Sequence, residues 1–483
     1  MVGFASCDDY LSEVPDNRTL IDSEDKVSEL LVGAYPMSCP YTFLEAMSDN
    51  TTDNMNTSLG SQENTLYYTW ELGKLVNTDS PSGYWDACYG AIAYANQALE
   101  AIDALEDTPR LRLLKSEALL SRAYAHFMLV NVWAKNYDPN TASSDLGVPY
   151  VKAVESSLIV NYTRNTVQEV YDLIEADLLE GLKNAGERTD KNAKPKYHFG
   201  LAAGKAFAAR FYLTKGEFDK VLEYSSDLGS KPRIIRDWKF ESKIASVEEQ
   251  TRDYSGVQRE TNLLVSTVPS AYMRTFMFDR YSSTSLSFNE IMGRATNPLG
   301  KKFYYDAPLN VGNRDNALAP KVNEYFKTTN PTAGTGFAFY RVILFSNDEL
   351  YLNRIEALVM TNRLDEALSE LEYFIGTRTD GYVAGTDKLT KAMIMSKYGT
   401  ASSEFSPFYS MTDEQAAFVK AIAEAKRRDL IHEGNRWFDI KRFNLVVNHK
   451  MGLSTEVLVK DDLRRVMQIP DHVVAAGLKP NVR

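Results

Sequence analysis

The sequence is poor in the residues on which most catalytic and metal centres depend. Its 483 residues include 3 cysteines and 5 histidines, with no CxxC pair and no HExxH motif. A P-loop and a nucleophile elbow are missing as well. These absences argue against a structural zinc site, a zinc protease and a phosphate-binding enzyme, and no motif for any cofactor is present.

Concentrated positive charge and long apolar runs are absent too. Lys and Arg number 54 against 65 Asp and Glu, which gives a net charge of -11. An acidic chain without a dense basic run repels the phosphate backbone, so we expect no nucleic-acid partner. Because no eighteen consecutive residues are apolar, we expect no segment that spans a bilayer.

Aromatic side chains, in contrast, are plentiful. The 28 Tyr, 22 Phe and 5 Trp make up 11% of the chain. A tyrosine offers a flat apolar face and a polar tip, which suits both cores and wet binding surfaces. We expect most of these rings to pack in the core of a large helical protein and a minority to contact a ligand.

The three cysteines fall into two groups. Phe4-Ala-Ser-Cys7 has small residues before a cysteine, as at the end of a lipoprotein signal. We therefore expect Cys7 to carry a lipid, and residues 1–22 to form a shortened signal and a tether, with the chain beginning inside that signal. Cys39 and Cys88 are compatible with one disulfide or with two buried thiols, and the sequence does not choose between them.

Helix-start signals recur along the chain, while the alternation typical of strands is confined to short pieces such as residues 337–343. Ser23 is placed to cap a helix, and Thr108-Pro109 combines an N-cap with a proline at the first helical position. Capping-box spacing occurs at Thr166…Glu169, Ser346…Glu349 and Thr412…Gln415. These signals predict a mainly α fold with little β structure.

Some of the predicted helices form pairs with a shared pattern. In residues 204–228 and 350–371, small residues lie where two helices approach, and a polar turn leads into the second helix. Residues 89–133 are a third candidate pair. This is the arrangement of tetratricopeptide repeats, but the pairs do not recur at a fixed period and so do not form a plain solenoid.

Two long insertions interrupt the helical pattern. Residues 49–83 are rich in Asn, Thr, Ser and Gly, with tyrosines and Trp70 among them, and residues 241–336 are irregular and carry several tyrosines and phenylalanines. Segments of this length without regular structure are uncommon in compact folds and are usually functional.

Residues 427–442 read Arg-Arg-Asp-Leu-Ile-His-Glu-Gly-Asn-Arg-Trp-Phe-Asp-Ile-Lys-Arg. This segment resembles the C-terminal signature of the SusD/RagB family, which consists of outer-membrane lipoproteins of Bacteroidetes. Further similarities follow in the family's order, at Cys7 to Pro15, at Trp85 to Asn96 and at Met467-Gln-Ile-Pro470. The sequence departs from the signature at Asp429, where the family usually has Glu, and at His432, where it usually has an aromatic residue.

The resemblance implies a single SusD-like domain over residues 23–483. In it, four irregular tetratricopeptide-like pairs support a loop-rich ligand-binding half, and we place these pairs within residues 84–134, 166–229, 346–376 and 412–445. It also implies a protein anchored by lipid to the outer face of the outer membrane. Such a protein captures oligosaccharides, or in some members peptides, for a SusC-like TonB-dependent transporter. No catalytic step belongs to the family, so we expect no enzyme activity.

We interpret the motif at 427–442 as structural. Gly434 is expected to end the helix that begins at Thr412, because glycine adopts the left-handed conformation at little cost. Trp437 and Phe438 are expected to be apolar anchors. Charges of alternating sign are expected to form a buried or half-buried network of Glu433, Arg436, Asp439 and Arg442.

Sugar chemistry selects the candidate ligand contacts. Aromatic faces stack on the apolar faces of sugar rings, while amide, carboxylate and guanidinium groups hydrogen-bond the hydroxyls. In and beside the two insertions, this selects Asp49, Asn54, Trp70, Trp85, Tyr272, Arg280 and Tyr281. We expect Trp70→Ala to weaken glycan binding with a nearly unchanged melting temperature, whereas a large loss of stability would place this ring in the core.

Two other functions stay open at this point. The first is an all-helical glycosidase. With 65 acidic residues, two carboxylates at glycosidase separation arise by chance, so the number of acidic residues is no evidence for this activity. Measuring turnover of a bound glycan tests it. A peptide-binding repeat scaffold is the second, although the aromatic insertions favour a separate ligand surface. His126 lies in an apolar stretch and is expected to be a core residue with satisfied hydrogen bonds.

Overall fold

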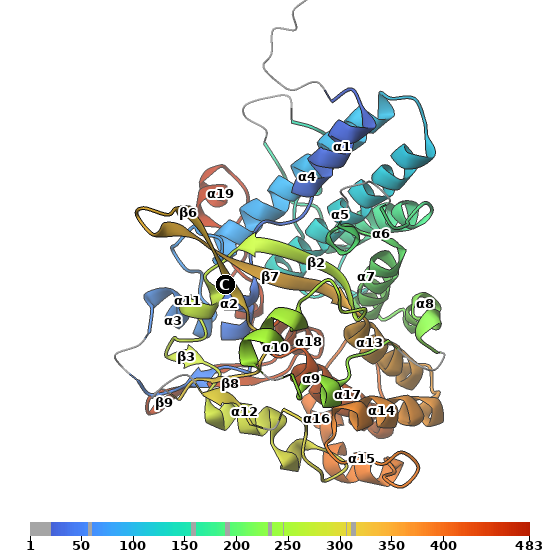
Figure 1. Ribbon diagram of the computed structural model, residues 1–483, viewed down its shortest axis with the longest axis vertical. Coiled ribbons are helices and arrows are strands. Elements are labelled where there is room, and N and C mark those ends of the chain that lie inside the picture. Colours follow the sequence, from blue (N-terminus) through green and yellow to red (C-terminus); the bar gives the residue numbers. More distant parts are fainter. Residues whose placement is uncertain are drawn as a thin grey trace, which may run out of the picture.

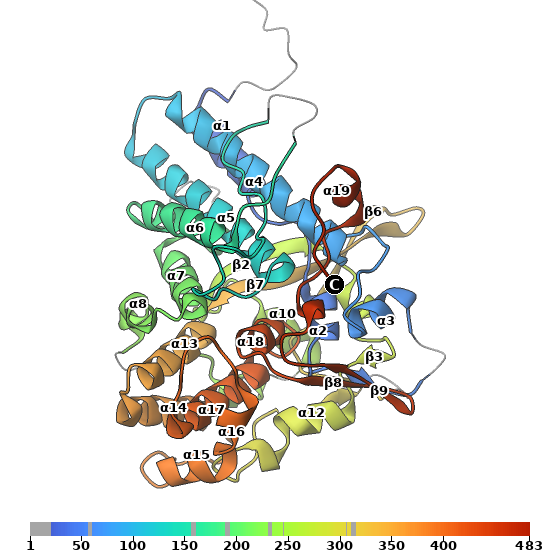
Figure 2. The same ribbon diagram turned by 180° about the vertical axis from the view of Figure 1, so that it is seen from behind.

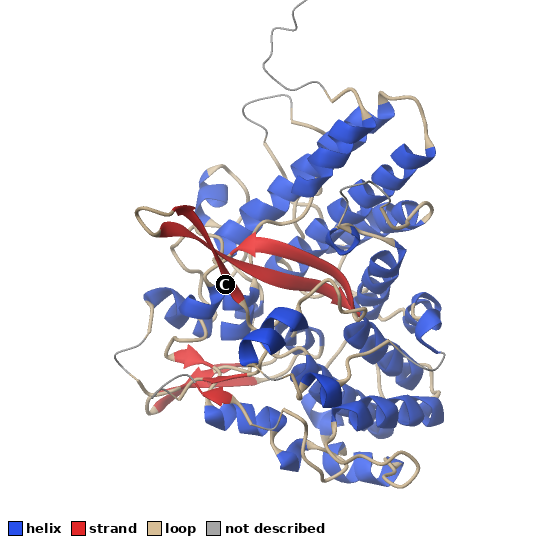
Figure 3. Cartoon of the chain, in the orientation of Figure 1, coloured by secondary structure: helices blue, strands red, loops and turns tan. Residues whose placement is uncertain are grey.

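The computed structural model describes residues 21–56, 60–155, 161–188, 194–229, 234–244, 246–305, 307–310 and 315–483. The chain is mainly helical with short strands, as Figure 3 shows, and the predicted fold class is confirmed. Within these ranges, no helix is both long enough and apolar enough to cross a membrane. Cys7, the expected site of lipid attachment, lies outside the described residues.

The helices differ widely in length. They are α1 (Glu24–Leu30), α2 (Tyr41–Ala46), α3 (Gln62–Tyr68), α4 (Pro81–Asp103), α5 (Pro109–Trp133), α6 (Val167–Leu182), α7 (Leu201–Lys215), α8 (Phe218–Tyr224), α9 (Trp238–Glu241), α10 (Val247–Tyr254), α11 (Tyr272–Thr275), α12 (Ser285–Met292), α13 (Asn347–Met360), α14 (Leu364–Arg378), α15 (Lys391–Tyr398), α16 (Ala401–Glu404), α17 (Asp413–Asp429), α18 (Arg436–Arg442) and α19 (Asp471–Ala475).

The strands pair in small antiparallel sheets. They are β1 (Thr52–Asp53), β2 (Asn262–Pro269), β3 (Tyr281–Ser282), β4 (Leu309–Asn310), β5 (Ala317–Leu318), β6 (Glu324–Asn330), β7 (Thr335–Ser346), β8 (Val447–Met451) and β9 (Ser454–Leu458). The pairs are β1 with β3, β4 with β5 and β8 with β9, while β7 lies between β2 and β6.

The long helices and the small sheets occupy different sides of the molecule. In Figures 1 and 2, α5 to α8, α13 and α14 lie on one side. The other side, here called the loop-rich side, holds β1, β3, α3, α11, the β8–β9 hairpin and the outer part of the β6–β7 hairpin. Parts of both predicted insertions therefore lie away from the helix pairs, although β2 and α12 also contact α7 and α17.

Local signals predicted several helix starts correctly. Ser23 accepts a hydrogen bond from the Lys26 amide, and Thr108 accepts one from the Leu111 amide with Pro109 in the first turn. Thr166 and Thr412 each form a complete capping box with the Glu or Gln three residues later. These caps satisfy amides that the helix itself leaves without partners.

The helix pairs are irregular, as expected. In the described part of residues 166–229 there are three α-helices, and α6 packs against both α5 and α7. Gly204 allows the close approach of α6 to α7, since a Cβ there would lie 2.8 Å from the Leu182 side chain. In the fourth predicted pair, α18 has only 7 residues. Its partner α17 packs mainly on α13 and α15.

The insertion at 241–336 is more regular than predicted. It contains β2, which pairs along its length with β7, so that Val265 lies opposite Ile343 and Val268 opposite Tyr340. It also contains α10, α11 and α12. A strand whose partner lies some seventy residues further along the chain leaves little local signal, and this is why the sequence pattern missed it.

Gly434 has the expected backbone conformation but a different role. Its φ is 70°, yet α17 already ends at Asp429, so Gly434 does not cap that helix. It lies in the turn before α18, where α2 approaches closely. A Cβ there would lie 3.0 Å from the Leu44 Cβ, and the Gly434 amide donates to Glu45 Oε1 at 2.7 Å.

The four charged residues of the C-terminal motif are buried and paired, but only Arg442 and Asp439 pair with each other. Glu433 pairs with Lys321, and Arg436 with Asp49. Fully buried Glu356 accepts hydrogen bonds from Lys426 at 2.9 Å and from both terminal nitrogens of Arg442. Burial alone would raise the pKa of Glu356, but Arg442 and Lys426 outweigh it and lower the pKa to about 2. Asp439 adds a second acceptor for Arg442 at 2.8 Å. The motif therefore fastens α18 to α13 and α17.

Candidate functional site

A two-residue strand pair joins the two insertions. Thr52 lies opposite Ser282 and Asp53 opposite Tyr281. Next to this pair, the Arg280 guanidinium donates to both oxygens of Asp53, at 2.7 and 2.6 Å. A bidentate pair of this kind fixes both side chains in one orientation.

Amide groups extend this join toward the surface. The Asn54 side-chain nitrogen donates to the Asp279 carbonyl at 3.2 Å and to Asn316 Oδ1 at 3.3 Å. The Ser61 amide donates to Asp279 Oδ2 at 2.8 Å. Burial raises the pKa of Asp279 even though backbone amides bind it. Asn54 and Arg280 stay partly exposed beside these contacts.

Beneath the join lies a stack of aromatic rings capped by arginine at both ends. In order, it consists of Arg280, Tyr281, Tyr68, His449, Trp70 and Arg464. Successive ring centroids are 4.4, 3.9 and 4.6 Å apart. The guanidinium at each end lies 5.2 Å from the centroid of the ring next to it. We call this the Arg-capped stack. It unites both insertions with the β8–β9 hairpin.

Four of the seven predicted ligand contacts are core side chains. Trp70 is fully buried, and its indole donates to the Met47 carbonyl at 2.9 Å. Tyr281 is buried inside the Arg-capped stack. Trp85 packs edge-on against Trp133, and Tyr272 stacks on Phe276. Rings covered in this way offer no free face to a sugar, so we replace their expected role in binding by a structural one.

The other three predicted contacts are partly exposed. Asn54 and Arg280 lie together at the join of the insertions, and Asp49 lies apart from them, held by Arg436 through two hydrogen bonds of 2.8 Å. Burial would raise the pKa of Asp49, but Arg427 and Arg436 hold it well below its usual range. The structure thus brings Asn54, Arg280, Trp70 and Tyr281 together, and leaves Trp85 and Tyr272 in other parts of the core.

The exposed aromatic rings of the loop-rich side are on the β6–β7 hairpin, which the sequence analysis did not select. The exposed fractions are 59% for Tyr325, 41% for Phe326 and 62% for Phe337. Grouped rings with this exposure usually mark a site of interaction. The alternation at 337–343 indicated a strand, but its outer end projects beyond β2, and only the tertiary structure reveals this.

The hairpin presents one aromatic face. Tyr325 pairs with Phe339 and Lys327 with Phe337, so these four side chains share a face. The Tyr325 and Phe339 ring centroids are 6.4 Å apart. On the opposite face, the Arg274 guanidinium lies 5.6 Å from the Phe326 ring centroid, and Arg274 Nε donates to Glu324 at 2.8 Å. This pairing ties the hairpin to α11, close in sequence to Arg280.

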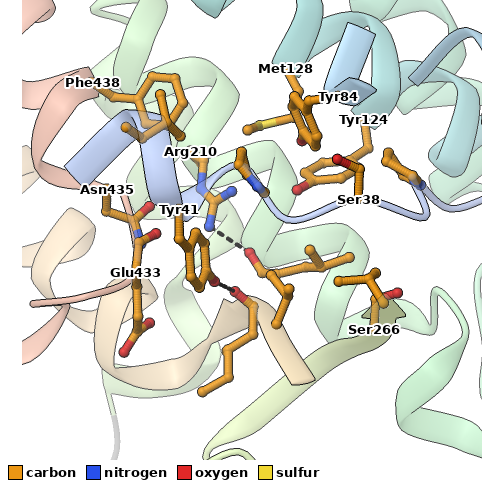
Figure 4. A pocket seen from close by; sticks show the side chains of 17 residues that line it. Ser38, Tyr41, Tyr84, Tyr124, Met128, Arg210, Ser266, Glu433, Asn435 and Phe438 are labelled. Atoms are coloured by element: carbon orange, nitrogen blue, oxygen red, sulfur yellow. Dashed lines mark hydrogen bonds between the residues drawn. The ribbon is translucent and has the colours of Figure 1, made fainter. Parts of the chain in front are cut away.

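A more enclosed pocket in the centre of the molecule is too small for a ligand. Figure 4 shows its lining, which includes Tyr41, Arg210 and Glu433. Tyr41 donates to the Ile343 carbonyl at 3.0 Å and Arg210 to the Leu344 carbonyl at 2.7 Å. Its volume of about 30 Å³ is enough only for one or two water molecules.

Two family models match most of the chain. Residues 9–213 match a SusD-like model described as "Starch-binding associating with outer membrane", and residues 269–471 match the model of the SusD family. The chain belongs to the SusD/RagB family. The expected identity of the C-terminal motif is thereby confirmed.

Known relatives of this SusD-family protein share its fold at low sequence identity. A SusD superfamily structure from Bacteroides fragilis has a TM-score of 0.65 at 18% identity, over 95% of this chain and 99% of that one. A SusD-like carbohydrate binding protein from Bacteroides vulgatus has a TM-score of 0.62 at 16% identity, over 94% and 96%. SusD-like protein P2 of Formosa agariphila is 26% identical over 145 residues, and this match covers only 26% of that protein.

Proposed function

We propose that this protein binds glycans at the loop-rich side and does not change them chemically. The observation that carries the proposal is the exposed aromatic face of the β6–β7 hairpin in a member of the SusD/RagB family. Tyr325, Phe337 and Phe339 supply flat apolar surfaces for sugar rings, and Lys327 supplies a hydrogen-bond donor on the same face. The description of the Bacteroides vulgatus relative as carbohydrate binding supports the same ligand class.

The join of the insertions completes this surface in our proposal. Asn54 and Arg280 are partly exposed and already oriented by Asp279, Asn316 and Asp53. A ligand hydroxyl that reaches them meets groups whose side-chain entropy has already been lost, which lowers the cost of binding. We assign Asp49 a weaker role, because Arg436 occupies both of its oxygens.

Delivery to a transporter is the second part of the proposal. A binding protein anchored through Cys7 at the outer face of the outer membrane would hand its glycan to a SusC-like TonB-dependent transporter. Family membership supports this arrangement. Helices α5 to α8 are then available to the transporter, because the proposed ligand surface lies on the opposite side of the molecule (Figures 1 and 2).

Calorimetry on the hairpin variant tests the proposed function. A glycan array probed with the full chain identifies a ligand, and Phe337→Ala is expected to weaken its binding about tenfold, the effect of losing one aromatic contact. The melting temperature should not change, because Phe337 is largely exposed. Tyr94→Ala, which removes an exposed ring from α4, serves as the control and should bind normally.

Three outcomes would contradict the proposal. Equal affinities of the Phe337→Ala variant and the wild type would exclude the hairpin as the site. Binding of peptides without any glycan would favour a peptide-capturing, RagB-like function. New reducing ends released from a bound glycan would show glycosidase activity.

A further inference from the structure

A second surface with the chemistry of a sugar site lies over α14. It is a cleft of about 510 Å³, within the range of roughly 300–1,000 Å³ typical of small-molecule sites. Three segments line it: α14 itself, the start of α9 with Tyr304, and the loop at 379–388. In Figures 1 and 2, α14 and the tip of the β6–β7 hairpin lie on opposite sides of the molecule. The cleft is therefore separate from the proposed glycan surface.

Three tyrosine rings supply the apolar part of the cleft. Tyr304, Tyr373 and Tyr382 each come from a different segment or turn, and each is only partly buried. Gly376 positions one of them, because a Cβ there would lie 2.5 Å from the Tyr382 ring. The bare backbone of α14 thus allows Tyr382 to lie directly against the helix.

Polar groups of both charge signs surround these rings. Glu372 accepts hydrogen bonds from the Tyr382 hydroxyl at 3.2 Å and from the Leu389 amide at 2.8 Å. Each carboxylate oxygen keeps a lone pair for a further donor. Asp237, Lys239 and Lys388 add one carboxylate and two ammonium groups at the rim. A lining of aromatic faces and mixed donors and acceptors, with little net charge, suits a neutral polyhydroxylated ligand.

The backbone around the cleft is fixed on both sides. The Tyr304 amide donates to the Arg378 carbonyl at 3.0 Å. On the other side, Lys301 Nζ donates to the Gly381 carbonyl at 2.8 Å. Asp387 accepts from the Val383 amide at 2.7 Å, which closes the loop. The loop therefore holds Tyr382 in place before any ligand arrives, and this preorganisation lowers the cost of binding.

We propose that the cleft formed by Tyr304, Tyr373 and Tyr382 over α14 is a second binding site for a neutral oligosaccharide. The ligand class rests on the proposed glycan function, whereas the location rests on the cleft alone. Two sites on opposite sides of one molecule would let it hold a branched or long glycan at two points, which raises the overall affinity without any new contact.

Hydrogen–deuterium exchange on the full chain tests both sites separately. The probes are maltohexaose, cellohexaose, xylohexaose and mannohexaose at millimolar concentration. With at least one of them, we expect slower exchange of the amides at 379–389 as well as at 324–340. Protection confined to 324–340 would overturn the second site and leave the proposed function intact. Protection confined to 379–389 would support the second site and overturn the hairpin location. No protection in either region with all four probes would overturn both.

Two variants secure the assignment. Ser369→Trp adds a ring to an exposed position on the cleft wall without removing any contact, so it should abolish protection at 379–389 and keep it at 324–340. Tyr382→Phe retains the ring and should bind like the wild type, whereas Tyr382→Ala should weaken binding at the cleft about tenfold. Unchanged protection at 379–389 in the Ser369→Trp variant would refute the cleft as the site.

Discussion

Individual aromatic side chains in this protein have different roles according to their burial, and residue type does not distinguish them. Trp70 and Tyr281 lie inside the Arg-capped stack, whereas Tyr325 and Phe337 extend from a hairpin into solvent. The segments at 49–83 and 241–336 were expected to carry the ligand contacts, yet four of the residues selected in and beside them are buried rings. Composition and spacing reveal which residues can stack, but tertiary contacts decide which faces stay free.

Trp70 provides a direct test of this division. We expect Trp70→Ala to lower the free energy of unfolding by roughly 3–5 kcal/mol, the usual cost of removing a large buried ring. The variant also loses the hydrogen bond to Met47 and the stacking on His449. Tyr325→Ala is the matched control and should change stability by less than about 0.5 kcal/mol. Chemical denaturation measures both, and similar small losses in the two variants would contradict the structure.

Single elements follow local rules at their starts, and tertiary contacts determine what they pack against. The capping boxes at Thr166 and Thr412 were visible in the sequence because a cap involves residues only three positions apart. The role of Gly434 was not visible, because it depends on α2, which lies almost 400 residues earlier. The strand β2 was missed for the same reason, since its partner β7 is distant in sequence.

Substitutions at two glycines with the same backbone conformation distinguish the cost of backbone strain from the cost of a steric clash. Gly434 and Gly452 have φ values of 70° and 61°, but only Gly434 has heavy atoms within 4 Å of an added Cβ. We expect Gly452→Ala to cost about 1 kcal/mol from backbone conformation alone. Gly434→Ala should cost a further 1–3 kcal/mol or so, because the methyl group pushes against α2. Thermal unfolding compares the two variants, and equal losses would show that α2 yields freely.

At the level of the complete fold, buried histidines make stability depend on pH. Val151 donates its amide to Nε2 of His126, and Ala319 donates its amide to Nε2 of His432, so both rings are held neutral. Burial lowers the pKa of each to about 3. An unfolded histidine takes up a proton near pH 6.5, so the unfolded chain binds more protons between pH 6.5 and 3. Stability from these two groups is fully present above pH 6.5 and is lost as the pH falls toward 3.

Each histidine contributes a slope of about 1.4 kcal/mol per pH unit in that range. Glu45 acts in the opposite direction, because burial raises its pKa to about 7. The folded protein therefore loses the stability contributed by this group as the pH rises from 4.5 to 7. Acidification from pH 6.5 to 4.5 removes about 1.4 kcal/mol per pH unit of the stability that comes from His126 alone. Denaturation curves across this range measure it. His126→Gln cannot titrate and should show a shallower slope, and an unchanged slope would exclude His126 as a source.

The Arg-capped stack also determines when the loop-rich side can form during synthesis. It needs Tyr68 and Trp70 from the first insertion, Tyr281 from the second and His449 from the last hairpin. Contacts this distant in sequence close large loops and form slowly. During synthesis, the rings of the first insertion have no stacking partners until β8 has been made. Aromatic rings that stay uncovered for so long favour aggregation. The surface proposed to bind glycans is thus among the last parts of the protein to be completed, even though its first residues are made early.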